Sequence, residues 1–247
     1  MQIDKITFND IAIFHPEEEF SVFHKLNFTR TIGGREWLRR FFTDPYADLK
    51  RIVGTQNIIK TLIAHLDEWP AEITNGTILM IDKFLDYQLD PIPRNQNAVN
   101  SLSYRLLHSQ DYSMAKYSVK HFSDFVHGLQ KILNLLSEVD LPEVLHFYIE
   151  RIDRLLREEP IQQLLKTPLD AKFSPPEMLF YAYHLRVTYR SRVLEMIDIY
   201  SRIDAWYSMA VAVRTFNLQF PKFVEGGQPH FEARGLYHVL LQKAVAY

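Results

Sequence analysis

The sequence contains no cysteine, which excludes disulfides, thiolate zinc sites and a cysteine nucleophile. Glycine is scarce, with 8 residues among 247. No apolar run approaches the ~18 residues that a membrane-spanning helix requires. The N-terminus also lacks the basic and then apolar segments of a secretory signal. These absences favour a cytoplasmic location, and we expect no membrane association.

Neither sign of charge dominates, because 28 Lys and Arg residues face 30 Asp and Glu residues, giving a formal charge of −2. This balance argues against a dedicated basic nucleic-acid binder, although a local basic patch would survive the averaging. Hydrophobic residues make up 47% of the chain and charged residues 23%, as in ordinary globular proteins. The length allows one large domain or two small ones.

Most of the chain has the apolar spacing of helices, so we predict a mainly α fold. The strongest helix start is Ser174-Pro175-Pro176-Glu177, where the serine can cap and the glutamate completes a capping box. No glycine or proline then follows until Pro221. We therefore predict one long helix from Pro175 to about Phe216, an antiparallel arm packed against residues 113–137 or 141–166.

The apolar residues of this predicted helix recur in steps of four and three, with one extra step of four between Tyr189 and Val193. This spacing is typical of a coiled-coil seam with a stutter, and an ordinary bundle helix is the alternative. The stripe consists of Met178, Ala182, Leu185, Tyr189, Val193, Met196, Tyr200, Ile203, Tyr207 and Ala210. Shorter helices are predicted over residues 17–26, 32–42, 46–66, 69–88, 95–107, 113–137 and 141 to about 160.

The C-terminal end differs from the rest. Leu218–Val224 has the composition of a strand, Gly226-Gly227 that of a turn, and Phe231–Ala246 is rich in β-forming residues. A β segment this short cannot bury its own faces. We therefore predict a helical domain over residues 1–216 and the first strands of a second domain over residues 217–247.

No self-contained catalytic site is visible. The chain has neither a Gly-x-x-x-x-Gly-Lys-Ser/Thr phosphate loop nor a serine in a Gly-x-Ser-x-Gly setting. Glu143 and His146 have the Glu-x-x-His spacing of di-iron bundles, but a second such pair is missing. We therefore predict no catalytic residue and no metal site.

One cluster of basic residues on a predicted helix allows two interpretations. Arg151, Arg154 and Arg157 lie three apart on one side of a predicted helix, among glutamates. The favoured interpretation is a salt-bridged, solvated face, and the alternative is a stripe that contacts nucleic-acid phosphates. Arg186, Arg190 and Arg192 have the same ambiguity.

The segment LNFTRTIGGREWLRR, from Leu26 to Arg40, resembles the core, or lever, domain of the MutS family of DNA mismatch-repair ATPases. That family has a Leu-Asn-x-Thr-x-Thr-x-x-Gly-x-x-x-Leu-Arg-Arg pattern, followed by a proline and a helix. A weaker resemblance, at Gly235 and His238, is to the start of the family's ABC-type ATPase domain. The first pattern falls here on Asn27, Thr29, Thr31, Gly34, Leu38, Arg39 and Arg40, and continues at Pro45, Asp48, Leu49 and Ile52.

The resemblance implies a multi-helix core with long antiparallel lever helices. It also implies a non-catalytic part of a larger protein, which couples ATP-driven dimer changes to the binding of mismatched or structured DNA. No cofactor is expected in this chain, whereas the full-length protein would be a DNA-dependent ATPase that uses ATP and Mg²⁺ and forms a homodimer through the ATPase domain. The family's mismatch-reading domain and DNA clamp are expected to be missing, and this chain to lack ATPase activity unless it is extended past Tyr247.

Within this resemblance, residues 27–40 would form a structural hub at the base of the levers. Thr29 or Thr31 can cap the following helix through a side-chain oxygen. Gly34 would allow a neighbouring helix to approach closely, and the arginines would fix the helix against its neighbours. The alternative is a coiled-coil module that binds protein partners through aromatic residues between Phe173 and Phe216, with no direct nucleic-acid role.

Overall fold

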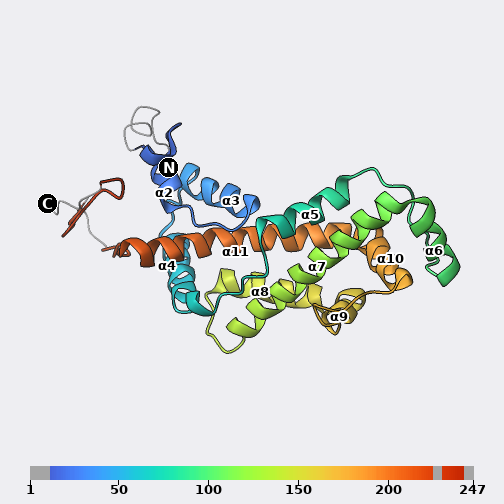
Figure 1. Ribbon diagram of the computed structural model, residues 1–247. Coiled ribbons are helices and arrows are strands. Elements are labelled where there is room, and N and C mark those ends of the chain that lie inside the picture. The colour runs from blue at the N-terminus through green and yellow to red at the C-terminus, as the bar shows by residue number, and fades with distance from the viewer. Residues whose placement is uncertain (1–11, 225–229, 242–247) are drawn as a thin grey trace.

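The computed structural model in Figure 1 describes residues 12–224 and 230–241, and these are mainly helical, with no strand among them. The mainly α prediction is therefore confirmed. The helices in chain order are η1 (Glu18–Phe20), α2 (Val22–Leu26), α3 (Ile32–Thr43), α4 (Leu49–Ile63), η2 (Leu66–Glu68), α5 (Asn75–Asp86), α6 (Ala98–Leu107), α7 (Ser109–Leu136), α8 (Glu143–Leu156), α9 (Glu159–Leu165), α10 (Pro175–Tyr183), the π turn η3 (His184–Thr188) and α11 (Arg190–Phe216).

Helix α11 is central to the fold. It packs most extensively on α3 and α4 and also contacts α8, as Figure 1 shows. The predicted apolar stripe is buried along its whole length except at Tyr189, which is half-buried. Polar residues on the other side of α11, among them Ser201, Asp204 and Ser208, are buried too. A helix buried on several sides needs no solvent-facing polar stripe.

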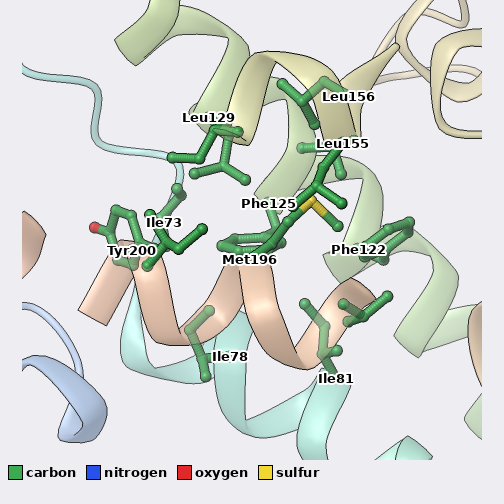
Figure 2. Close-up of a cluster of buried hydrophobic side chains, with 14 of the residues drawn as sticks. Ile73, Ile78, Ile81, Phe122, Phe125, Leu129, Leu155, Leu156, Met196 and Tyr200 are labelled. Atoms are coloured by element: carbon green, nitrogen blue, oxygen red, sulfur yellow. The ribbon is translucent and has the colours of Figure 1, made fainter. Parts of the chain in front are cut away.

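The main hydrophobic core lies where α5, α7, α8 and α11 meet, as Figure 2 shows. The Phe125 ring of α7 meets the Tyr200 ring of α11 edge-on, with 6.1 Å between the ring centroids. This geometry is one that aromatic pairs prefer. The side chains labelled in Figure 2 are Ile73, Ile78, Ile81, Phe122, Phe125, Leu129, Leu155, Leu156, Met196 and Tyr200.

The helix predicted from Pro175 to Phe216 is interrupted at Tyr189, whose φ of −112° and ψ of 6° are not helical, so the prediction of one unbroken helix was wrong. Helix α10 begins with the expected capping box, in which the Ser174 amide donates to Glu177 Oε2 at 2.8 Å. The π turn η3 then separates α10 from α11, just before the extra step between Tyr189 and Val193. Since π turns are a recognised cause of helix kinks, α10 is free to pack on α6 and α7 while α11 follows α3 and α4.

Two arginines at the π turn hold α5 in place. The Arg186 guanidinium donates to the carbonyls of Phe84 and Tyr87, and that of Arg190 donates to the carbonyl of Leu85 and to a carboxylate oxygen of Asp86. The last carbonyls of a helix have no partners within it and carry partial negative charge, so cations are favourable there. These two arginines therefore serve the fold.

Two further local predictions were wrong. The helix predicted over 17–26 is divided at Ser21, whose side chain caps α2 by accepting from the His24 amide at 3.3 Å. The predicted C-terminal β segment is not found in residues 218–224 and 230–241.

Within residues 12–224 and 230–241 no strand is available to pair with this segment, and a strand needs a neighbour for its backbone groups. The chain leaves α11 through Asn217, whose φ is 49°, and then contacts α4. The Pro221 carbonyl accepts from Gln56 Nε2, and Lys60 Nζ lies 5.0 Å from the centroid of the Phe220 ring. The predicted turn at Gly226-Gly227 lies outside the described residues.

Two phenylalanines should respond differently to truncation. Phe125 is fully buried and should cost about 3–5 kcal/mol of unfolding free energy when changed to alanine, because a cavity remains. Phe147 on α8 is 57% exposed, so Phe147→Ala should cost less than about 1 kcal/mol. Urea unfolding followed by circular dichroism measures both, and equal losses would contradict the position of the core.

Candidate functional site

The site that carries the sequence resemblance is the joint between α3 and α11. At its centre lies Asp204 of α11, which is 1% exposed. Its Oδ2 accepts from the Thr31 amide at 2.9 Å and from Thr31 Oγ1 at 2.7 Å. The Arg30 amide donates to both carboxylate oxygens, at 3.0 and 3.1 Å. A buried carboxylate needs such partners, since desolvation of an unpaired one is very costly.

Thr31 joins this carboxylate to the start of α3. Its Oγ1 accepts from the Gly34 amide at 3.0 Å, so Thr31 is the N-cap residue and one of the two capping predictions is confirmed. The hydroxyl group thus donates to Asp204 and accepts from the helix. Thr29 has another role, because its amide and hydroxyl both donate to Asn27 Oδ1 and close a local turn.

The two glycines allow α3 to lie directly on α11. A Cβ atom at Gly34 would be 2.1 Å from Asp204 Oδ2, and one at Gly33 would be 2.3 Å from Ser201 Oγ. Neither glycine has a positive φ, so close approach, and not backbone conformation, excludes a side chain here. The expected close approach at Gly34 is confirmed.

The segment before α3 is fixed to α11 by further contacts. Ser208 Oγ accepts from the Phe28 amide at 2.8 Å and donates to the Leu26 carbonyl at 3.1 Å. The Arg30 side chain donates to the Tyr207 hydroxyl at 2.9 Å and lies over the Tyr207 ring. Backbone groups that would otherwise be unpaired are thus satisfied by buried side chains of α11.

The last three hub residues have different surroundings. Leu38 is fully buried against Phe23 and Ala205. The Arg39 guanidinium lies over the Phe14 and Phe23 rings, whereas that of Arg40 lies over Trp37. Both arginines therefore pack on aromatic faces, a contact that helps to fix a guanidinium in position.

Burial raises the pKa of the Asp204 carboxyl above its usual range, although hydrogen bonds from Arg30 and Thr31 and the charge of Arg30 act in the opposite direction. The carboxyl therefore resists ionisation in the folded protein. Desolvation of the charged form is the largest effect on this group.

The predicted phosphate-contacting arginines are largely engaged within the fold. Arg151 makes a bidentate pair with Glu195, at 2.6 and 2.8 Å, and this hydrogen-bonded pair lowers the pKa of Glu195. Arg157 pairs with Asp153 at 2.9 Å. Arg154 is exposed and donates only a long hydrogen bond, 3.4 Å, to the Glu150 carbonyl. The pairs of Arg151 and Arg157 agree with the interpretation of this cluster as a salt-bridged face. Phosphate contact by the three arginines stays a prediction.

Residues near the C-terminal end are not part of the joint. Gly235 adopts a φ of 65°, which favours glycine, in a turn of the segment 230–241. The His238 ring accepts from the Leu240 amide at 3.3 Å. A role for Gly235 and His238 at the start of an ATPase domain stays a prediction.

Side chains of the types that bind metal ions lie close together at a place that the sequence did not indicate. Asp90, His108 and Asp111 bring their ligand atoms within 4.8 Å of one another beside the start of α7. His108 Nδ1 lies 2.7 Å from Asp90 Oδ2, and an imidazole with two carboxylates can hold a divalent cation. By contrast, Glu143 lies near Lys50 and His146 near Glu150. Asp90 comes from a preceding loop, so only the His-x-x-Asp spacing was visible in the sequence.

Sequence reasoning also missed the α11 half of the joint. Ser201, Asp204 and Ser208 lie more than 160 residues from the hub residues they contact. The available signal was the spacing of Ser201, Asp204 and Ser208, which lie three and then four residues apart and therefore on one face of the helix.

Comparisons of the chain with known protein families, with curated proteins and with solved structures find no match. Among the described residues, no helix combines the length and the apolar character required to cross a bilayer.

The close approach at Gly34 predicts a large effect of a single methyl group. Gly34→Ala should lower the unfolding free energy by about 3 kcal/mol, because the new Cβ displaces a carboxylate that is held by several hydrogen bonds. Gly54→Ala is the matched control, since a Cβ there meets nothing within 4 Å in the middle of α4. It should stabilise the protein by about 0.5–1 kcal/mol. Similar effects of both changes in urea unfolding would contradict the joint.

The raised pKa of Asp204 predicts a pH-dependent contribution to stability. Since the folded-state pKa lies above that of the unfolded chain, the contribution is fully present below about pH 4 and is lost as the pH rises through the folded-state pKa. Asp204→Asn cannot titrate, so the difference in unfolding free energy between wild type and this variant reports Asp204. This difference should fall from pH 4 towards pH 7, by about 1.4 kcal/mol per unit of pKa shift. A difference that grows with pH would contradict the direction.

Proposed function

We propose that this chain is the non-catalytic core and lever part of a MutS-like DNA mismatch-repair family ATPase. The observation that carries this proposal is where the resembling residues lie. Thr31, Gly34 and Leu38 form the buried joint on the middle of α11, which is where a part that transmits motion must be rigid. A peripheral position of these residues would argue against a hub, but Thr31, Gly34 and Leu38 are buried.

The long helices supply the second part of the proposal. Helices α7 and α11 contain 28 and 27 residues, and each would therefore span roughly 40 Å. In the proposed mechanism, ATP binding in an ATPase domain outside residues 1–247 changes how two such domains pair. Helices rooted at the hub then move as rigid bodies and open or close on DNA. Packed helices are known to transmit changes between distant sites in this way.

DNA binding by the chain tests the proposal. Fluorescence anisotropy with mismatched, branched and fully paired duplexes should detect binding whose affinity falls steeply with salt, because phosphate contacts release counterions. Arg154→Ala should reduce the slope of log K against log salt by about 1. Arg214→Ala is the control, since Arg214 is paired with Asp67 at 2.7 Å and should leave the slope unchanged. No ATP turnover is expected, and turnover by the chain would contradict the assignment.

A protein-interaction module is the second candidate, and one surface favours it. Val99, Leu102 and Leu106 on α6 are 76%, 53% and 71% exposed at helical spacing. The aromatic residues between Phe173 and Phe216 are buried or half-buried, so they offer a partner less surface than these residues of α6. Absence of salt-sensitive DNA binding, together with self-association or partner binding lost in Leu106→Glu, would favour this candidate over the first.

A further inference from the structure

A pocket of about 790 Å³ lies between α3, α4, the start of α8 and α11, beside the hub. Its volume falls within the range of about 300–1,000 Å³ that is usual for small-molecule sites. Helix α3 contributes Trp37 and Arg40, α4 contributes Arg51, and α11 contributes Arg202 and Trp206. Residues far apart in the sequence therefore converge on one concave surface.

The pocket contains cationic groups without acidic partners. Arg40, Arg51 and Arg202 form no ion pair with a carboxylate in the described part of the chain, and each guanidinium lies over an aromatic ring. With Lys50 there are four basic lining residues against two acidic ones, Asp44 and Glu143, so the net lining charge is +2 (4 − 2). Lys50 alone approaches a carboxylate, at 3.8 Å from Glu143.

Arg202 is the most informative of these residues. Its Nε is buried and has no hydrogen-bond partner among the described residues. Its guanidinium lies 3.9 Å from the Trp37 ring centroid and 4.9 Å from that of Tyr148. Burial lowers the pKa of Arg202, and the nearby charge of Arg40 lowers it further, against the opposite effect of Tyr46. A half-buried guanidinium beside a second one that no carboxylate neutralises favours a bound anion.

The start of α8 adds neutral donors on the same side. Pro142, Glu143 and Val144 line the pocket, and α8 begins at Glu143 without a side-chain cap. The first amide groups of a 14-residue helix therefore lack intrahelical partners here, and the end of the helix carries partial positive charge. Such a helix end favours phosphate.

We propose that this pocket binds a small phosphate ester of about nucleotide size, with Arg40, Arg51 and Arg202 contacting its phosphate oxygens. Planar guanidinium groups bind phosphate with two parallel hydrogen bonds, and their aromatic supports hold them in place before the ligand arrives. Phe41, Val53 and Trp206 also line the pocket and offer apolar surface to the rest of the ligand. The inference does not depend on the proposed function, because neither a lever motion nor DNA contact by Arg154 enters it.

Calorimetric titration of the full chain with pyrophosphate, AMP and adenosine tests this inference. Pyrophosphate and AMP should show saturable binding, and adenosine should bind at least about tenfold more weakly, because phosphate is the group recognised. Tryptophan fluorescence should change in parallel, since Trp37 and Trp206 line the pocket, whereas the third tryptophan, Trp69, is buried against Tyr207.

Variants assign the binding to the pocket. Arg40→Ala and Arg202→Met should each weaken pyrophosphate binding about tenfold or more, the usual effect of losing a charge-assisted hydrogen bond. Arg40 is exposed, so its variant should fold even if Arg202→Met does not. Arg39→Ala is the matched control, because Arg39 lies on the same helix but over the Phe14 and Phe23 rings, and it should change the affinity less than about twofold.

Several results would overturn the inference. One is the absence of saturation by about 1 mM pyrophosphate and AMP, and another is equal affinity for adenosine and AMP. Unchanged binding in both Arg40→Ala and Arg202→Met would place the phosphate elsewhere. Binding of a DNA duplex at this pocket without any binding of AMP or pyrophosphate would identify a nucleic-acid contact and exclude a small-molecule site. Loss of DNA binding in Arg154→Ala with intact AMP binding would leave the inference in place.

Discussion

The attachment of the N-terminal segment to the central helix depends most on one buried carboxylate, that of Asp204, which accepts more hydrogen bonds from this segment than any other side chain of α11. Its oxygens accept from the Arg30 and Thr31 amides and from the Thr31 hydroxyl. Burying a carboxylate is costly, and the cost is offset only if the donors stay in place. Any slip of α3 along α11 would leave the carboxylate unpaired. Asp204 therefore fixes the register of the two helices. The apolar contacts of Leu38 stabilise the packing of α3 on α11 but depend less on this register.

Helix α11 has two functional sides that cannot move independently. One side carries the apolar stripe into the core shared with α5, α7 and α8, where Tyr200 meets Phe125. The other carries Ser201, Asp204 and Ser208, which hold the hub. Because both sets project from one helix of 27 residues, a displacement of the hub must be transmitted to the core or resisted by it. This rigidity is what the proposed lever would require. The helical path from α10 is interrupted at the π turn η3 and Tyr189, where the neighbours change from α6 and α7 to α3 and α4.

The sequence revealed those features that depend on neighbouring residues. The Ser174–Glu177 capping box, the Thr31 cap and the apolar stripe of α11 were predictable because each follows from spacing within a few turns. The partners of Gly33 and Gly34 were not, because Ser201 and Asp204 meet them only after the chain has folded. The C-terminal strand was wrong for the opposite reason, since local β propensity at Leu218–Val224 meets no neighbouring strand in the part of the chain that the structure describes.

The hub and the phosphate pocket are two sides of the same short helix, α3. Gly33, Gly34 and Leu38 contact α11, whereas Trp37, Arg40 and Phe41 line the pocket. On α11 the two sets alternate in the same way, with Asp204 at the hub and Arg202 in the pocket.

An anion bound between Arg40, Arg51 and Arg202 would connect α3, α4 and α11 directly. Its negative charge would also offset the repulsion between Arg40 and Arg202. A ligand at 100 times its dissociation constant stabilises the state that binds it by about 2.7 kcal/mol. Occupation of the pocket would therefore tighten the same joint that Asp204 holds from the other side.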